Sequence, residues 1–370
     1  MKRSNLPFLT HAAEGVRALT PYVPGKPIAE LERELGISHS IKLASNENPL
    51  GVSPRVTQAI TDAMGELSRY PDGGGFELHQ RLAEKHQRDA SSIILGNGSN
   101  DVLDMVARVF LAPGKISLFS QYAFAVYPIS SQAAGAELVS VPAKQYAHDL
   151  DTMLQRVTDN TAVVWIANPN NPTGTWLTEK ALYSFLQQLP QTTIVVIDEA
   201  YLEYVQAADY PDASQWLDEF PNLIVTRTFS KAYGLASLRI GYALAHPDVA
   251  DLLNRVRQPF NVNSMAQVAA LAALEDEAFI QQSVALNNAG MEQLCQGFEA
   301  LSLDYIPSVG NFITLDLGSD ASVVDRALLK RGCIVRPLAA YGMPNHLRIS
   351  IGLEEENQRL LTALREVLQR

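Results

Sequence analysis

Lys231 is the residue of this chain whose type and surroundings most directly indicate chemistry. Ser230 precedes it, and Arg239 follows eight residues later. Apolar runs on either side, at 223–226 and 240–244, predict two buried strands, so the lysine lies on a short loop between sheet elements. A lysine held in this way can form a Schiff base with an aldehyde when its surroundings favour the neutral amine.

The neighbours of this lysine also predict an anion site. Serine hydroxyls and the guanidinium fork of an arginine suit a phosphate dianion. A ligand that carries both an aldehyde and a phosphate is pyridoxal 5'-phosphate, which is therefore the predicted cofactor. An ordinary lysine in a surface loop is the alternative for a motif this short.

Polar residues follow two further predicted strands. Asp198-Glu-Ala-Tyr201 comes directly after the apolar run 193–197. A carboxylate buried there needs a cationic partner, which a pyridinium nitrogen would supply, and Tyr201 could reach the phenolic oxygen of the same ring. A helix-capping aspartate beside a packed tyrosine is the alternative. The stretch 168–174, Asn-Pro-Asn-Asn-Pro-Thr-Gly, follows the apolar run 162–167 and predicts an extended turn.

A third polar turn, Gly96-Asn-Gly-Ser-Asn-Asp101, lies between a predicted strand and a predicted helix at 102–111. This layout directs backbone N–H groups and a helix dipole at one point, which favours an anion. The two glycines also resemble the start of a dinucleotide fingerprint, but Asp101 stands where its third glycine would be. A nicotinamide-dependent dehydrogenase and a helix cap without a ligand remain the alternatives for this turn.

The elements that must position these residues predict an α/β fold. Apolar runs predict strands at 116–119, 138–141, 162–167 and 193–197, and helical patterns lie at 54–67, 76–86, 149–157 and 178–189. Alternation of this kind predicts a mostly parallel central sheet with helices on both faces. Ligands of such sheets lie beyond the carboxyl ends of the strands, where the polar residues stand.

The last third of the chain predicts a smaller α+β domain. Helical patterns lie at 249–256 and 264–301, strand patterns at 312–317, 333–336 and 346–350, and a final amphipathic helix at 354–368. We expect an N-terminal arm that contributes to the small domain at 1–45, a large cofactor-binding domain at 46–258 and a small domain at 259–370.

Composition excludes several classes of function. The 370 residues are 47% hydrophobic and 19% charged, which is typical of a globular protein. The net charge of −11 argues against a nucleic-acid surface, and no apolar run approaches the ~20 residues of a membrane span. Two cysteines, 295 and 333, and seven scattered histidines offer no metal-ligand spacing. This spacing predicts no metal site. Because the N-terminus has no apolar leader, we expect a cytoplasmic protein.

In this order, the motifs resemble those of the fold-type I pyridoxal-phosphate aminotransferases of class I and II. The shared features are the Gly-Ser-Asn turn, Asn-Pro-Thr-Gly, Asp-x-x-Tyr, Ser-Lys with an arginine eight residues on, and a late Leu-Arg-Ile-Ser. The resemblance spans essentially the whole chain. More narrowly, the stretches 43–51, 69–72 and 168–174 resemble the branch of the family that acts on histidinol phosphate. This narrower resemblance implies transamination between L-histidinol phosphate and 2-oxoglutarate by a ping-pong mechanism.

The resemblance also implies roles for individual residues. The Schiff-base and proton-transfer lysine is Lys231, the carboxylate at the pyridinium nitrogen is Asp198, and the ring oxygen is bound by Tyr201 and Asn171. The phosphate is bound by Gly98, Ser99, Asn100, Ser230 and Arg239. The side chain that stacks on the cofactor ring is Phe124, and Tyr122 is the neighbouring candidate for this position. Tyr70 reaches the phosphate from a second subunit, which implies a homodimer.

The same resemblance assigns substrate recognition to four residues, Tyr22, Asn46, Arg336 and Arg348. Histidinol phosphate has no carboxylate whereas glutamate has two, so one pocket must accept both. Two arginines twelve residues apart could serve either anion, because a guanidinium fork fits phosphate and carboxylate. An aromatic amino acid as substrate, a threonine-phosphate decarboxylase on the same scaffold, and a non-enzymatic cofactor-binding module of a regulator are the alternatives.

Overall fold

A computed structural model describes residues 6–22 and 25–369 of the chain. The parts of the predicted arm at 1–5 and 23–24 lie outside the described residues. The strands are β1 Ile41–Lys42, β2 Ile93–Gly96, β3 Ile116–Ser120, β4 Glu137–Val141, β5 Thr161–Ala167, β6 Ile194–Asp198, β7 Leu223–Thr228, β8 Gly241–Ala245, β9 Asp304–Ile306, β10 Phe312–Asp316, β11 Cys333–Ile334, β12 Arg336–Pro337 and β13 His346–Ser350. The helices are α1 Glu14–Arg17, α2 Ile28–Leu35, α3 Pro54–Ala63, α4 Phe76–His86, α5 Ser99–Phe110, α6 Val126–Ala133, α7 Leu150–Gln155, α8 Glu179–Gln188, α9 Pro247–Val256, α10 Ser264–Leu274, α11 Glu277–Ala300, α12 Ala321–Leu329 and α13 Glu354–Leu368.

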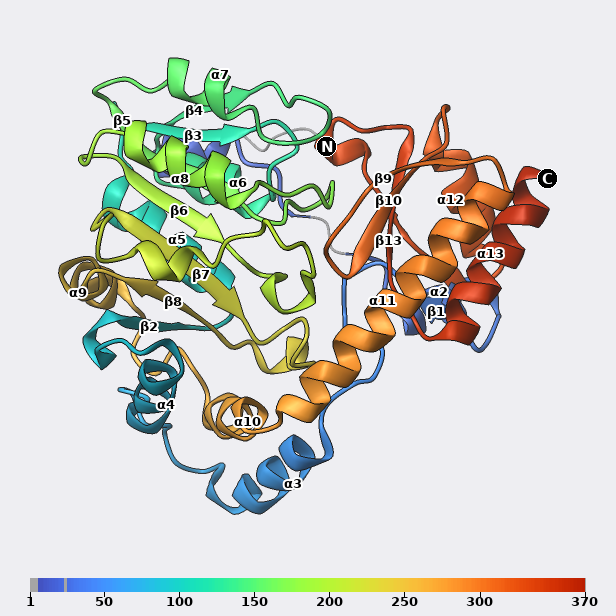
Figure 1. The fold of residues 1–370 in the computed structure, drawn as a ribbon, viewed down its shortest axis with the longest axis horizontal. Helices are drawn as coiled ribbons and strands as arrows, with labels where there is room; N and C mark the ends of the chain where they lie inside the picture. Colours follow the sequence, from blue (N-terminus) through green and yellow to red (C-terminus); the bar gives the residue numbers. More distant parts are fainter. Residues whose placement is uncertain (1–5, 23–24, 370) are drawn as a thin grey trace.

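A seven-stranded sheet forms the larger half of the molecule, with the strand order β2-β8-β7-β6-β5-β3-β4 (Figure 1). Neighbouring strands from β7 to β4 run parallel, and β8 runs antiparallel to both β7 and β2. The mostly parallel sheet predicted from the sequence is therefore confirmed. Because the parallel strands end at one edge, the residues that follow β5, β6 and β7 meet there.

Alternation along the strands divides the apolar side chains between two cores. On β5, Val164 and Ile166 face the core that α4, α8 and α10 cover, together with Ile197 of β6 and Val225 of β7. The intervening side chains, such as those of Trp165, Val196 and Ile224, face a second core under α5, α6 and α9. Strands with both faces buried explain why these segments are continuous apolar runs in the sequence.

The smaller half of the molecule is built on a four-stranded antiparallel sheet, β12-β13-β10-β9, which packs with α11, α12 and α13 (Figure 1). β1 pairs in parallel with β11, so residues 41–42 join this half although they precede the large sheet in sequence. The predicted boundary at residue 258 differs from this packing. Helix α10 follows that residue, yet its alanines pack with α3 and α4 in the first core of the large sheet.

Three predicted elements differ in the structure. The helical pattern 264–301 forms two helices, because the side chain of Asp276 accepts a hydrogen bond from the Phe279 N–H at 3.1 Å and begins α11. The strand pattern 333–336 divides into β11 and β12, which belong to different sheets. Helix α5 begins three residues earlier than predicted, at Ser99, whereas α4 has the predicted bounds.

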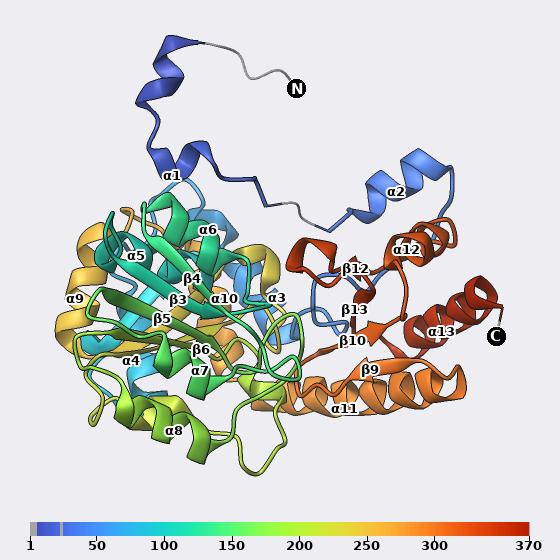
Figure 2. The ribbon, with the colours of Figure 1, turned by 90° about the horizontal axis from the view of Figure 1, so that it is seen from above.

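The segment before α2 lies along the outside of the large half. Helix α1 packs on α6, and the carbonyl of Gly15 accepts a hydrogen bond from Gln132 Nε2 at 3.2 Å. Figure 2 shows this segment above α6, with α2 beyond it beside the small half. Within the described ranges, no helix combines the length and the apolar character that a membrane crossing needs.

Candidate active site

A cavity of about 250 Å³ opens at the carboxyl ends of β5, β6 and β7, on the side that faces the small half. Side chains from both halves and from the N-terminal segment line it. They include Tyr22, Asn46, Ser99, Asn100, Phe124, Asn171, Asp198, Tyr201, Thr228, Ser230, Lys231, Arg239, Arg336, Tyr341 and Arg348. Residues from 22 to 348 therefore meet at one place, as a ligand site at the ends of parallel strands requires.

Asp198 ends β6, and its side chain is buried. Its Oδ2 accepts a hydrogen bond from the Tyr127 hydroxyl at 2.8 Å, and its Oδ1 accepts one from Thr226 Oγ1 at 2.9 Å. Burial raises the pKa of this carboxyl, while the two hydroxyl donors oppose the rise. A buried carboxylate held in this way is poised to receive a cation from the cavity.

Lys231 extends from the loop after β7 toward the same region. Its Nζ donates a hydrogen bond to the Ser45 carbonyl at 3.2 Å and lies 5.6 Å from the centre of the Tyr201 ring. Burial, followed by the positive charge of Arg348, lowers the pKa of the amine to about 7. A substantial fraction of this lysine is therefore neutral near neutral pH, as nucleophilic attack on an aldehyde requires.

The N-terminus of α5 forms the anion-binding side of the cavity. Gly98 precedes the helix with φ of +80°, and no side chain caps the first turn. The Arg239 guanidinium lies so close that a Cβ on Gly98 would stand 2.3 Å from its Nη2. Arg239 also points toward Ser230, whose Oγ accepts from Nη1 at 3.4 Å. Helix dipole, backbone N–H groups, hydroxyl and guanidinium converge here, which suits a phosphate.

A buried hydrogen-bond network joins the halves beside Lys231. Nδ2 of Asn46 donates to the Tyr201 hydroxyl at 2.9 Å, and burial raises the pKa of that tyrosine to about 12. Arg348 of β13 donates from Nη1 to Asn171 Oδ1 at 2.5 Å and from Nη2 to the Ala44 carbonyl at 2.8 Å. Its buried Nε has no hydrogen-bond partner among the described residues. That nitrogen is a donor available to an anionic ligand.

The outer part of the cavity is aromatic and basic. The guanidinium carbon of Arg336, on β12, lies 5.5 Å from the centre of the Tyr22 ring. Tyr341, from the loop between β12 and β13, also lines this part. Two arginines, at 336 and 348, thus face one cavity in a chain whose net charge is −11.

The structure gathers nearly all of the residues singled out in the sequence. Phe124 lines the cavity, whereas Tyr122 has φ of +61° and packs on Tyr146 with ring centres 5.9 Å apart. Gly98 lies beneath Arg239 rather than on the lining. Tyr70 does not line this cavity: it is 82% exposed and stacks on Phe260, with ring centres 4.7 Å apart.

Sequence reasoning missed several residues of the site, among them Tyr127, Thr226 and Tyr341. Thr226 could have been found, because the parallel register pairs it with Asp198 once β6 and β7 are known to be neighbours. Tyr127 and Tyr341 carried no such signal. The first reaches Asp198 from α6, a helix that was not predicted, and the second comes from a loop of the other half.

Comparison with known proteins agrees with this geometry. A family model described as "Aminotransferase class I and II" matches residues 38–364. The chain is 59% identical over 363 residues to histidinol-phosphate aminotransferase 2 of Pseudomonas aeruginosa, with 98% of both chains covered. It is 58% identical over 365 residues to histidinol-phosphate aminotransferase 2 of Pseudomonas fluorescens, with 98% of this chain and 99% of that one covered.

Among solved structures, histidinol-phosphate aminotransferase from Sinorhizobium meliloti in complex with pyridoxal-5'-phosphate matches with a TM-score of 0.89. The two chains are 31% identical, and the match covers 96% of this chain and 97% of that one. The fold-type I architecture predicted from the sequence is therefore confirmed. The chain belongs to the class I and II aminotransferase family.

Proposed function

We propose that this enzyme transfers an amino group between L-histidinol phosphate and 2-oxoglutarate, giving imidazole-acetol phosphate and glutamate, with pyridoxal 5'-phosphate as cofactor. This is a step of histidine biosynthesis. The observation that carries the proposal is the position of Lys231 and Asp198 in one cavity that Arg336 and Arg348 also line. The names of the relatives at 58 and 59% identity support the choice of substrate.

The residues of the cavity fit this cofactor. Asp198 is a buried carboxylate without an arginine or lysine bonded to it in the described chain, and a protonated ring nitrogen would supply the missing charge. The uncapped start of α5, with Arg239 against Gly98, would hold the phosphate. Lys231 would bind the aldehyde carbon, and Tyr201 with Asn171 would bind the ring hydroxyl. Phe124 is the aromatic side chain of the lining available for stacking on the ring.

The mechanism requires a base beside the substrate carbon that bears the amino group. When bound, the cofactor's protonated ring withdraws electrons from that carbon and makes its hydrogen removable. Nζ of Lys231, whose pKa lies at about 7, can accept this proton and return it elsewhere at neutral pH. Asp198 contributes a negative charge that keeps a proton on the ring nitrogen, and Tyr127 and Thr226 hold that charge in place.

Substrate selection follows from the two arginines. Arg348 carries a buried Nε without a hydrogen-bond partner in the described part of the chain, so it can bind the carboxylate of glutamate directly. Arg336 lies farther out beside Tyr22, where it can hold the substrate phosphate at the end of histidinol phosphate or the second carboxylate of glutamate. Both amino donors then present their reacting carbon to Lys231 in turn, as a ping-pong mechanism requires.

We infer that the enzyme is a homodimer in which Tyr70 reaches the phosphate in the partner's cavity. Tyr70 and Phe260 form an exposed aromatic pair, and Leu67 and Phe76 nearby in sequence are more than half exposed. Exposed apolar side chains in one region indicate an interface. Inactive Lys231→Ala and Tyr70→Ala proteins should regain activity when they are refolded together, because one site of each mixed dimer is intact, about a quarter of all sites. No recovery would contradict the shared site.

The division of the chain and its location are proposals of the same kind. We propose an N-terminal arm, a large cofactor-binding domain and a small domain, and the packing of α10 supports a change of domain between α10 and α11. Two unpaired cysteines support a cytoplasmic enzyme, because the cytosol keeps thiols reduced. Cell fractionation tests the location, and limited proteolysis tests the division.

The decisive experiment is the visible spectrum of the cofactor-loaded enzyme during a half-reaction. L-histidinol phosphate alone should abolish the absorption of the lysine–cofactor adduct, and 2-oxoglutarate should restore it. Loss of the band with phenylalanine but not with histidinol phosphate would favour an aromatic amino acid aminotransferase. Release of carbon dioxide from threonine phosphate with the band retained would favour a decarboxylase. A protein that gains no visible band with pyridoxal 5'-phosphate would contradict the role of Lys231.

A further inference from the structure

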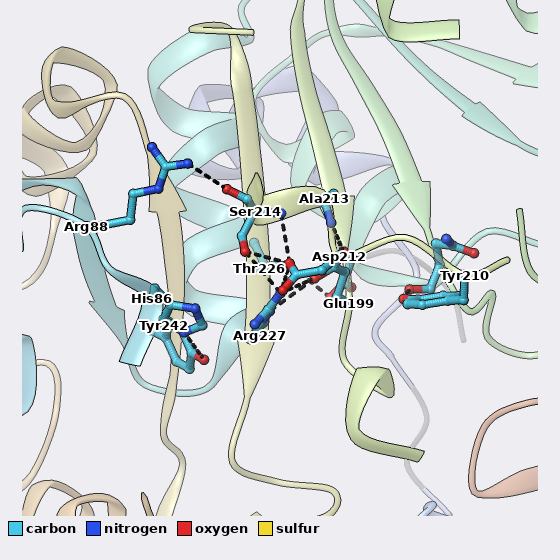
Figure 3. A network of polar contacts seen from close by, with 12 residues as sticks. His86, Arg88, Glu199, Tyr210, Asp212, Ala213, Ser214, Thr226, Arg227 and Tyr242 are labelled. Carbon is cyan, nitrogen blue, oxygen red and sulfur yellow. Dashed lines mark hydrogen bonds and ion pairs between the residues drawn. The ribbon is translucent and has the colours of Figure 1, made fainter. Parts of the chain in front are cut away.

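A second polar network lies near the carboxyl ends of β6 and β7, outside the cavity lining (Figure 3). Successive residues of a strand point to opposite faces. Asp198 lines the cavity and Thr226 bonds to it from the same face of the sheet, so Glu199 and Arg227, which follow them, point to the other face. Arg227 donates to Glu199 Oε2 from Nε at 3.0 Å and from Nη2 at 2.7 Å. Glu199 is 0% exposed and Arg227 4% exposed, so this ion pair is buried.

One short segment, residues 210–214, binds this ion pair and the neighbouring strand, and we call it the strap. The backbone N–H of Ala213 donates to Glu199 Oε1 at 2.9 Å. The carboxylate of Asp212 accepts from Nη2 of Arg227, and Ser214 Oγ accepts from the same nitrogen at 3.4 Å. The hydroxyl of Tyr210 donates to the Asn168 carbonyl, beyond the end of β5. Figure 3 shows the contacts of Arg227, Glu199, Asp212 and Ser214 gathered in one cluster, with Tyr210 set apart from it.

The three anchors of the strap are the ends of the three strands that carry the site. Asn168 begins the turn that contains Asn171, Glu199 follows Asp198 directly, and Arg227 follows Thr226. The backbone N–H of Glu199 also donates to the Thr226 carbonyl at 2.9 Å. Any shift of Glu199 or Arg227 along its strand therefore moves the cavity-facing residue beside it. None of the strap residues is part of the cavity lining.

We propose that the strap, through the Arg227–Glu199 pair and the Tyr210–Asn168 bond, positions Asp198, Lys231 and Asn171 relative to one another. Its members are positioning residues, since they act through the strand ends and not on the substrate. Loops at the ends of parallel strands are otherwise free to move independently. A common anchor on the far face fixes their mutual distances without occupying the cavity.

The test uses two conservative variants and one matched control. Arg227→Lys keeps the charge but loses the fork that reaches Glu199 twice. Tyr210→Phe removes one hydroxyl and no charge, so it carries the test if Arg227→Lys does not fold. The control is Val195→Ala, a buried substitution near the amino end of β6 that removes core packing away from the carboxyl ends that carry the site. Urea denaturation establishes how much stability each variant loses.

Three readouts separate positioning from stability: the affinity of the apoprotein for pyridoxal 5'-phosphate, the pH midpoint of the visible band, and the split between kcat and KM. We expect both strap variants to bind the cofactor more weakly and to shift the midpoint. We expect kcat to fall about 10-fold in Arg227→Lys and about 3-fold in Tyr210→Phe, below the ~100-fold that a 1 Å misplacement costs. KM should change less than kcat, and Val195→Ala should lose stability alone.

Strap variants that lose stability as Val195→Ala does, yet keep the cofactor affinity, the midpoint and kcat of the wild type, would overturn the inference. The inference rests on the proposed contacts of Asp198 and Lys231 with the cofactor, and the two can fail separately. A wild-type apoprotein that does not bind pyridoxal 5'-phosphate would refute those contacts. If the wild-type apoprotein binds the cofactor normally and the strap variants behave like the wild type, only the positioning role of the strap would be refuted.

Discussion

Replacement of Tyr127 by phenylalanine tests how the buried carboxylate of the site is held. The change deletes only the hydroxyl that donates to Asp198 Oδ2 at 2.8 Å. The ring itself stacks on Trp165, with centres 5.2 Å apart and planes 9° from parallel, and phenylalanine can keep that contact. The variant should therefore fold and differ from the wild type mainly in the charge state of Asp198.

The size of the effect follows from the type of bond that is lost. A hydrogen bond to a charged group contributes about 1.5–3 kcal/mol. Its loss costs more free energy where water cannot replace the donor. Each 1.4 kcal/mol corresponds to a factor of about ten in affinity, so the apoprotein should bind pyridoxal 5'-phosphate about 10- to 100-fold more weakly. The Tyr127 hydroxyl opposes the rise in the pKa of Asp198 that burial causes, so loss of this donor raises that pKa further. The affinity deficit should therefore grow as the pH falls.

Titration of the apoprotein with the cofactor at several pH values measures this directly. Tyr183→Phe is the matched control, because it deletes a tyrosine hydroxyl that donates to the Glu219 carboxylate at 2.6 Å, but on the exposed surface. That bond should contribute little, as exposed carboxylate contacts do. An affinity for Tyr127→Phe within two-fold of the wild type at every pH, or an equal loss in both variants, would refute the reasoning.

Three further predictions concern the amine, the arginine fork and the phosphate turn. The rate at which the apoprotein forms its cofactor adduct should rise with pH around a midpoint near 7, the pKa of Lys231, because the neutral amine attacks. Arg348→Gln should move this midpoint upward, because it removes a positive charge that lowers the pKa of the amine. An unchanged midpoint would contradict this electrostatic cause. Arg348→Lys should raise KM for glutamate about 10- to 100-fold, because it loses a charged hydrogen bond worth about 1.5–3 kcal/mol, and steady-state kinetics measures this. Gly98→Ala should weaken cofactor binding in an apoprotein titration, because its Cβ would meet Arg239 Nη2 at 2.3 Å and its φ of +80° disfavours alanine; unchanged affinity would mean that the phosphate does not lie there.

Much of the fold was predictable because its signals are local. Buried parallel strands are continuous apolar runs. The runs at 116–119 and 162–167 lie within β3 and β5, and all of the run at 193–197 except Thr193 lies within β6. The predicted elements were wrong where the local hydrophobic pattern does not determine the structure. One capping aspartate divides the predicted helix 264–301, and neighbouring residues of 333–336 pair with different sheets because of where those sheets lie.

The sequence by itself determined where Lys231 and Asp198 lie, since the residues before and after each one carry the strand and turn signals that place them at the sheet edge. Only the tertiary structure decided what makes them reactive. The pKa of Lys231 at about 7 requires burial and the nearby charge of Arg348, which is 117 positions away along the chain. The hydroxyl of Tyr127 reaches Asp198 across a sequence separation of 71 residues. Burial and electrostatic fields depend on distances in space, and residue order does not encode these distances locally.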